Sequence, residues 1–250
     1  MTKKMFRLAI VLCVAIVLVV PCMAGAALLG TVEIEHTGYG AKGTLEIWGG
    51  GRNGTNVQGG VYKLTKTDGT GQGDIWPEGV LGGFCIDLLQ VSPRYSTTYG
   101  VVMPEEGPKP IQFLGSTMGT EKAEYISELW GRFFDQAWVD SDHFTCQQNA
   151  EAEAFAAAIW EIVYEDLPSS PSQWDVKVDG TDGALGFRCK NADTTLANNW
   201  LHALDGTGPK ADLRALVNDC KQDYIVAVPE PATIALLGFG ALTLFRWRKV

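Results

Sequence analysis

Cysteines are the residues of this 250-residue chain with the clearest capacity for covalent chemistry, and four of the six lie between its two apolar ends. These four are Cys85, Cys146, Cys189 and Cys220. None of them has the CxxC spacing that is typical of zinc and redox sites. Four cysteines in an oxidising compartment favour two disulfides, and they allow three different pairings.

Other residue types that carry out catalysis form no recognisable constellation. His36, His143 and His202 lie far apart, and the chain contains neither an HExxH nor a GxSxG motif. Glu161 and Glu165 lie four residues apart on an expected helix. Glycosidase carboxylates face one another across a cleft, so we interpret this pair as a solvated acidic face. The sequence therefore predicts a non-enzymatic protein without a metal or a cofactor.

The charge of the chain is unevenly distributed. The formal net charge is −9, but six of the 20 basic residues lie within residues 1–26 and 232–250, which contain no acidic residue. Residues 27–231 keep 14 basic and 29 acidic residues, a net charge of −15. A surface of this charge repels phosphate backbones. Nucleic acid is therefore not an expected partner.

The elements that would position any site begin with strands. Fifteen glycines lie between Gly38 and Gly83, interleaved with short apolar runs, which predicts brief strands joined by glycine-rich turns. Residues 84–89 are expected to form a buried strand, and residues 95–103 another. Residues 224–228 are expected to form the last strand of the domain.

Helical periodicity follows the strands. Apolar residues at three- and four-residue steps predict helices over residues 121–138 and 149–166, with Thr120 as the cap of the first. A third helix is expected over residues 194–204, capped by Asp193, and residues 211–217 are expected to add a further helical turn or two. This order predicts an α+β fold, in which Gly-rich antiparallel β-strands pack with a small helical subdomain.

Residues 1–26 have the three parts of a secretory signal peptide. Lys3, Lys4 and Arg7 precede an apolar run over residues 8–20, and Ala24-Gly25-Ala26 supplies the small residues that signal peptidase requires. We expect an N-terminal signal helix, export by the Sec machinery and removal by signal peptidase. An uncleaved membrane anchor is the alternative interpretation.

The C-terminal end also combines three features. Pro229, Glu230 and Pro231 precede an apolar stretch over residues 232–245, and a basic cluster of Arg246, Arg248 and Lys249 follows. The apolar stretch is shorter than the roughly 20 residues of a comfortable membrane-spanning helix, and the basic residues favour a cytoplasmic end. An ordinary tail anchor would leave the Pro-Glu-Pro box unexplained.

Together these features resemble the PEP-CTERM sorting signal. The resemblance implies export across the inner membrane of a Gram-negative bacterium and transient anchoring through a C-terminal hydrophobic helix. It also implies cleavage near the Pro-Glu-Pro box by an exosortase. The implied destination is the cell surface or an exopolysaccharide matrix.

Segments 83–88, 154–164 and 222–224, together with residues 196–204, resemble the thioester-domain-like proteins. In true thioester domains a strand cysteine is bonded to the glutamine of a Gln-x-Ala-Ile-Trp helix, and an amine can attack the strained acyl group. Cys85 matches the cysteine, but Ala156 occupies the glutamine position and has no carboxamide. The resemblance therefore implies the fold more than the chemistry. We expect Cys85 to be structural, and we predict disulfides between Cys85 and Cys146 and between Cys189 and Cys220.

The expected organisation is a signal peptide over residues 1–26, an exported α+β domain over 27–227 and the sorting signal over 228–250. The expected function is that of a non-enzymatic protein of the cell surface or exopolysaccharide matrix. One alternative is a carbohydrate-binding module, with Trp48 and Trp76 as exposed aromatic side chains. Another is an adhesin with an internal thioester.

Overall fold

The computed structural model describes residues 27–109, 116–178 and 186–229. The predicted signal helix and hydrophobic tail lie outside these residues, as do Glu230, Pro231, Arg246, Arg248 and Lys249. The strands are β1 (Gly30–Gly49), β2 (Arg52–Gly71), β3 (Gly79–Cys85), β4 (Thr97–Val102), β5 (Phe187–Lys190), β6 (Leu213–Asn218) and β7 (Lys221–Ala227). The α-helices are α1 (Gly119–Phe133), α2 (Ala137–Asp140), α3 (Cys146–Tyr164) and α4 (Thr194–His202), and the short 3-10 helices are η1 (Gln72–Ile75), η2 (Pro104–Glu106) and η3 (Pro171–Gln173).

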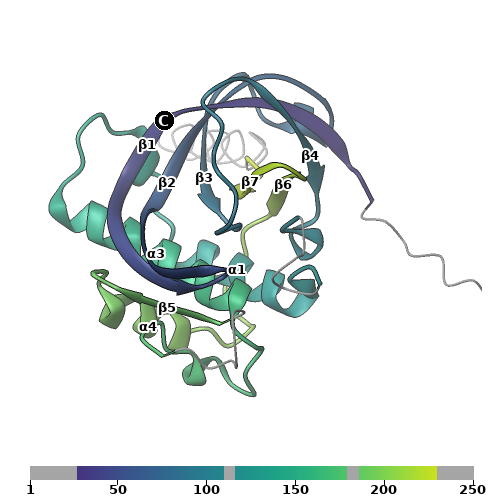
Figure 1. Ribbon diagram of the computed structural model, residues 1–250. Coiled ribbons are helices and arrows are strands. Elements are labelled where there is room, and N and C mark those ends of the chain that lie inside the picture. The colour runs from purple at the N-terminus through teal and green to yellow at the C-terminus, as the bar shows by residue number, and fades with distance from the viewer. Residues whose placement is uncertain (1–26, 110–115, 179–185, 230–250) are drawn as a thin grey trace, which may run out of the picture.

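Every strand pair of the sheet is antiparallel. The order is β2-β3-β7-β6-β4-β1-β5, and β1 also pairs with β2. The pairing of β1 with β2 joins the two ends of a six-stranded series, so these strands form a closed sheet (Figure 1). β5 extends the sheet at the far end of β1. The sequence correctly predicted antiparallel strands combined with helices.

The prediction of brief strands was wrong at β1 and β2, which are 20 residues long each. Most of the glycines lie inside these strands and not between them. Gly49, Gly50 and Gly51 make the connecting turn, and all three have positive φ angles, which glycine adopts without a steric penalty. Gly40 serves close packing instead, because a Cβ atom there would lie 2.2 Å from the backbone oxygen of Trp138.

The helices cover the outer side of the closed sheet (Figure 1). Aromatic rings form the contact: the ring centroid of Phe84 on β3 lies 4.8 Å from that of Phe155 on α3 and 5.5 Å from that of Trp130 on α1. The same buried cluster continues through the sheet and the helices, so the described residues share one hydrophobic core. None of the described helices is both long enough and apolar enough to cross a membrane.

The predicted helices exist, with shifted boundaries. The helix expected over 121–138 is divided, because Phe134 leaves α1 with an extended backbone before α2 begins. The helix expected over 149–166 is α3, and α4 begins after Asp193, which caps it as predicted. The further helical turn expected over 211–217 was wrong. That segment is largely β6, which lies between β4 and β7 and buries Leu213 and the run from Ala215 to Val217.

Candidate functional site

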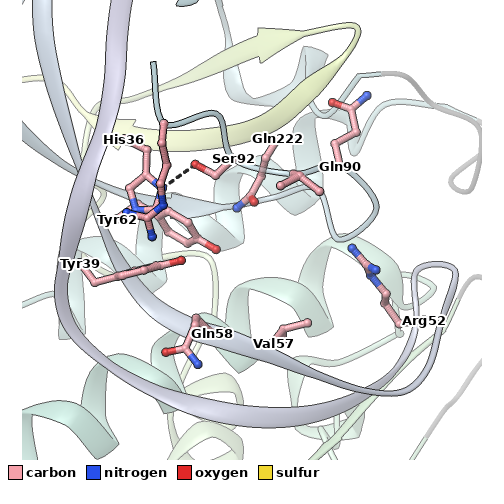
Figure 2. Close-up of a pocket in the computed structure, with 11 residues that line it drawn as sticks. His36, Tyr39, Arg52, Val57, Gln58, Tyr62, Gln90, Ser92 and Gln222 are labelled. Carbon is pink, nitrogen blue, oxygen red and sulfur yellow. Dashed lines mark hydrogen bonds between the residues drawn. The ribbon is translucent and has the colours of Figure 1, made fainter. Parts of the chain in front are cut away.

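A pocket of about 350 Å³ lies where one end of the closed sheet meets the long hairpin of β1 and β2. Its lining comes from four parts of the chain (Figure 2). These are β1 with His36 and Tyr39; β2 with Arg52, Val57, Gln58 and Tyr62; the segment after β3 with Gln90, Val91, Ser92 and Arg94; and β7 with Gln222. The volume falls within the range of about 300–1,000 Å³ that is usual for small-molecule sites.

Strand alternation places His36 on the inner face of the sheet. Val32, Ile34 and His36 are buried, while the residues between them are only partly buried. Two apolar side chains and a histidine therefore follow one another on one face of β1. His36 takes its place at the end of this apolar row, beside the pocket.

A chain of hydrogen bonds begins at His36. Its Nδ1 atom lies 2.8 Å from the Ser92 hydroxyl oxygen, and that hydroxyl is also hydrogen-bonded to the phenol of Tyr224. The other ring nitrogen of His36, Nε2, is buried and has no hydrogen-bond partner among the described residues. Burial and, next, the positive charge of Arg94 lower the pKa of His36. The imidazole is therefore neutral at pH 7.

Four tyrosines lie around this series of hydrogen bonds, and one of them, Tyr224, belongs to it. Tyr39 and Tyr62 each lie within about 5 Å of the His36 ring, with centroid distances of 4.7 and 5.0 Å. Tyr224 packs against Tyr62 at 5.4 Å and against Tyr99 at 5.8 Å. Burial raises the pKa of Tyr62, Tyr99 and Tyr224 above the ordinary value for a phenol. These hydroxyls therefore stay protonated, and the Tyr224 hydroxyl is the one that is hydrogen-bonded to Ser92.

α3 fixes the segment that leads into the pocket. The indole nitrogen of Trp160 donates to the Cys85 carbonyl oxygen at 2.8 Å, and the backbone nitrogen of Leu88 donates to the Tyr164 hydroxyl at 2.8 Å. Trp160 and Tyr164 are one helical turn apart, so they hold two points of the segment at once. The strand expected over residues 84–89 is therefore wrong in its extent, because β3 ends at Cys85. Arg52 fastens the same segment by donating to the carbonyl oxygens of Leu88 and Leu89 at 2.5 and 3.2 Å.

Neither predicted disulfide is present, and all four cysteines of the described residues are free. Cys85 is tied to Trp160, whereas Cys146 is the first residue of the same helix. Fourteen residues at 1.5 Å each separate them by about 21 Å along the helix, far beyond the reach of a disulfide. Cys189 is buried on β5, and Cys220 is exposed in the turn between β6 and β7.

The environment of Cys85 is that of an unreactive thiol. Its sulfur donates a hydrogen bond to the Asp87 carbonyl oxygen at 3.1 Å, and burial raises its pKa above the ordinary value. Ala156 lies one helical turn before Trp160 in α3, and both residues are buried. The alanine offers no acyl group to this sulfur.

The two tryptophans expected to be exposed, Trp48 and Trp76, both contact other residues of the folded domain. Trp76 is only 2% exposed, and its indole donates to the Ala227 carbonyl oxygen at 2.7 Å. Trp48 is half-buried, with Arg188 and Lys190 over its ring at 4.6 and 4.9 Å. The prediction of exposed sugar-stacking tryptophans was therefore wrong for Trp76.

The prediction of a solvated acidic face at Glu161 and Glu165 was also wrong, because both side chains are buried. Each accepts a hydrogen bond from a backbone nitrogen: Glu161 from Asp175 at 2.9 Å, and Glu165 from Phe187 at 2.7 Å. They connect α3 to the segments that follow it. The described residues contain no group of three or more side chains that could hold a metal ion.

Sequence reasoning did not find the pocket residues. Three of them carried a local signal: His36 interrupts an apolar alternation, Gln222 begins the last buried strand, and Ser92 follows the buried segment after β3. Nothing in the sequence indicated that these three positions, up to 186 residues apart, would meet.

Comparison with known proteins adds information on the C-terminal end alone. Searches of curated proteins and of solved structures find no match. Residues 227–249 match the family model of the PEP-CTERM protein-sorting motif. The predicted sorting motif is thereby confirmed, and the chain carries the signal of an exported protein that is sorted by an exosortase.

Proposed function

We propose that this protein is exported by a Gram-negative bacterium and reaches the cell surface or the exopolysaccharide matrix after exosortase processing. The match of residues 227–249 to the sorting motif is the observation that carries this proposal. The position of Pro229 supports it, because this exposed residue lies two positions after the end of β7. The Pro-Glu-Pro box therefore begins where the folded domain ends and where a protease can reach it.

Processing in the host tests the sorting step. Glu230→Ala should leave the precursor at full length in the membrane fraction, whereas the wild-type chain loses its tail and leaves that fraction. Glu78→Ala replaces an exposed glutamate on the folded domain and serves as the matched control. Normal processing of the Glu230→Ala variant would contradict the proposal.

For the molecular role, we propose that the protein binds carbohydrate non-covalently and does not catalyse a reaction. The pocket supports this role, because amides, hydroxyls and aromatic rings line it together. Such groups orient a polar ligand in a partly apolar site. Ser92 and His36 could act as a nucleophile and its base, but a working base is oriented by a third group. Within the described residues His36 Nε2 has no such partner.

A serine-reactive fluorophosphonate probe tests the absence of catalysis. We expect no labelling of Ser92 in the folded protein, because a serine without an oriented base is a weak nucleophile. Labelling that is lost in Ser92→Ala would replace the binding role by a hydrolytic one.

A further inference from the structure

The charge of the pocket is opposite to that of the chain. Arg52 and Arg94 are among its lining residues, and no aspartate or glutamate is, although the chain as a whole has 29 acidic and 20 basic residues. Lys42 lies just outside the lining, with its ammonium group 4.2 Å from the ring centroid of Tyr39. A local excess of positive charge on an acidic protein favours an anionic ligand.

Two of these cations are available to a ligand. The third cation, Arg52, donates hydrogen bonds to the backbone carbonyl oxygens of residues 88 and 89, and the charge of Asp87 partly balances its own. Arg94 is exposed, and its guanidinium lies 6.0 Å from the ring centroid of Tyr39. Neither Arg94 nor Lys42 forms an ion pair within the part of the chain that the structure describes. Both lie close to the Tyr39 ring, so an anion bound beside this ring would meet two positive charges.

The remaining lining is neutral and can both donate and accept hydrogen bonds. Three amides, those of Gln58, Gln90 and Gln222, surround the pocket, and Gln222 lies between Tyr62 and Arg52 in Figure 2. Three buried polar atoms at the pocket have no hydrogen-bond partner among the described residues: His36 Nε2, Gln90 Oε1 and Gln222 Nε2. Buried polar groups are normally paired. A sugar hydroxyl can donate a hydrogen bond to the Gln90 oxygen and accept one from the Gln222 nitrogen, and it can pair with His36 Nε2 in either role, depending on the tautomer.

We infer that this pocket binds a carboxylate-bearing sugar residue, such as a uronate unit of an acidic polysaccharide. Arg94 and Lys42 pair with the carboxylate beside Tyr39, while the amides and His36 bind the ring hydroxyls. Val91, which is 75% exposed at the rim, provides apolar contact for a neighbouring unit of the chain. The inference rests on the proposed binding role and adds the chemical class of the ligand.

Calorimetry on the full chain in mild detergent tests this assignment with four ligands. Trigalacturonate has both sugar rings and carboxylates; maltotriose has rings without carboxylates; citrate and inorganic phosphate have negative charge without rings. We expect binding of trigalacturonate alone, weakened by about 0.5 M NaCl because salt screens exposed charges. Equal binding of maltotriose would overturn the role of charge. Equal binding of citrate or phosphate would overturn the role of the sugar.

Two variants locate the binding. Arg94→Gln should weaken trigalacturonate binding about tenfold, the loss expected for one charge-assisted hydrogen bond. Arg188→Gln removes the same charge at an exposed position outside the pocket and should leave binding unchanged. Gln222→Met keeps the side-chain size and removes the amide, so it too should weaken binding.

The inference would be overturned if none of the four ligands bound, or if Arg94→Gln and wild type bound trigalacturonate with equal affinity. These outcomes are independent of exosortase processing, which is measured in the host. Equal binding of maltotriose and trigalacturonate would overturn the ligand class alone and leave the proposed carbohydrate-binding role standing, whereas absence of binding to all four ligands would overturn both.

Discussion

Buried polar residues in the closed sheet differ in whether their side chains have hydrogen-bond partners. His36 is 3% exposed and Gln222 is 5% exposed, yet each leaves a side-chain nitrogen without a hydrogen-bond partner in the described structure. Asp223 is fully buried, and its carboxylate oxygens accept hydrogen bonds from the backbone nitrogens of Lys109 and Asn218. A buried polar group is costly unless it is paired. Asp223 therefore has a structural role, whereas His36 and Gln222 have capacity left for a ligand.

Glu153 gives a prediction at this scale. Burial raises its pKa to about 7, above the ordinary value of 4.5. Because the folded-state pKa is the higher one, its contribution to stability is complete below about pH 4.5 and is lost as the pH rises through about 7. Glu153→Gln cannot lose a proton. We therefore expect this variant to gain stability relative to wild type between about pH 5 and pH 8.

Urea denaturation at the two pH values measures this difference in the free energy of unfolding. Glu121→Gln, at an exposed glutamate of α1, is the matched control and should behave like wild type at both. A Glu153→Gln variant whose advantage does not grow with pH would disprove the assignment of the buried carboxyl.

At the scale of elements, α3 organises the site without lining it. Its side chains Trp160 and Tyr164 hold the segment that leads from β3 to the pocket. The helix begins with a complete capping box, in which the Thr145 hydroxyl accepts from the Gln148 backbone nitrogen at 3.1 Å. The Gln148 side chain in turn accepts from the Thr145 backbone nitrogen at 3.0 Å. Both ends of α3 are thus fixed, and the segment is fixed with them.

Thr145→Ala should lower the free energy of unfolding by about 1 kcal/mol, since it leaves a backbone donor of the first helical turn without its side-chain acceptor. Thr145→Ser retains the hydroxyl and should lose much less. Chemical denaturation followed by far-ultraviolet circular dichroism measures both variants. Equal losses in the two would show that the methyl group matters and that the cap does not.

Helices were more predictable than strands in this chain. α3 follows from apolar periodicity and α4 from its capping residue Asp193, which are local properties of a sequence. The length of β1 and β2 was missed, because their glycines were interpreted as turns. Glycine is also required where another element packs closely. At Gly43, a Cβ atom would lie 2.4 Å from the Glu153 carboxyl carbon on α3. Only the packed helix reveals that requirement.

At the scale of the whole molecule, the last strand completes the fold just before the sorting motif begins. β7 lies between β3 and β6, and its end residue Ala227 accepts the indole hydrogen bond of Trp76. The Val228 backbone nitrogen still donates to the Asp212 carbonyl oxygen at 2.8 Å, whereas Pro229 is exposed. The first exposed residue of the sorting motif, Pro229, therefore lies only two positions after the end of the last strand, Ala227.

Truncation tests this boundary. A chain of residues 27–229 should unfold in one cooperative thermal transition, at the same midpoint as residues 27–250 in detergent. A chain of residues 27–223 loses most of β7 and opens the sheet between β3 and β6, so it should show no such transition. Circular dichroism on heating distinguishes the two. A stable 27–223 chain would contradict the structural role of β7.

The sequence by itself determined the sorting motif, the antiparallel strands with helices, and the positions of α3 and α4. Each of these depends on contiguous residues: a short box with its apolar and basic neighbours, a periodicity, or a cap. The tertiary structure alone decided that the cysteines lie apart, that Trp76 is buried, and that His36, Ser92 and Gln222 meet in one pocket. Closure of the sheet brings distant segments together, and no local pattern encodes the distance between them.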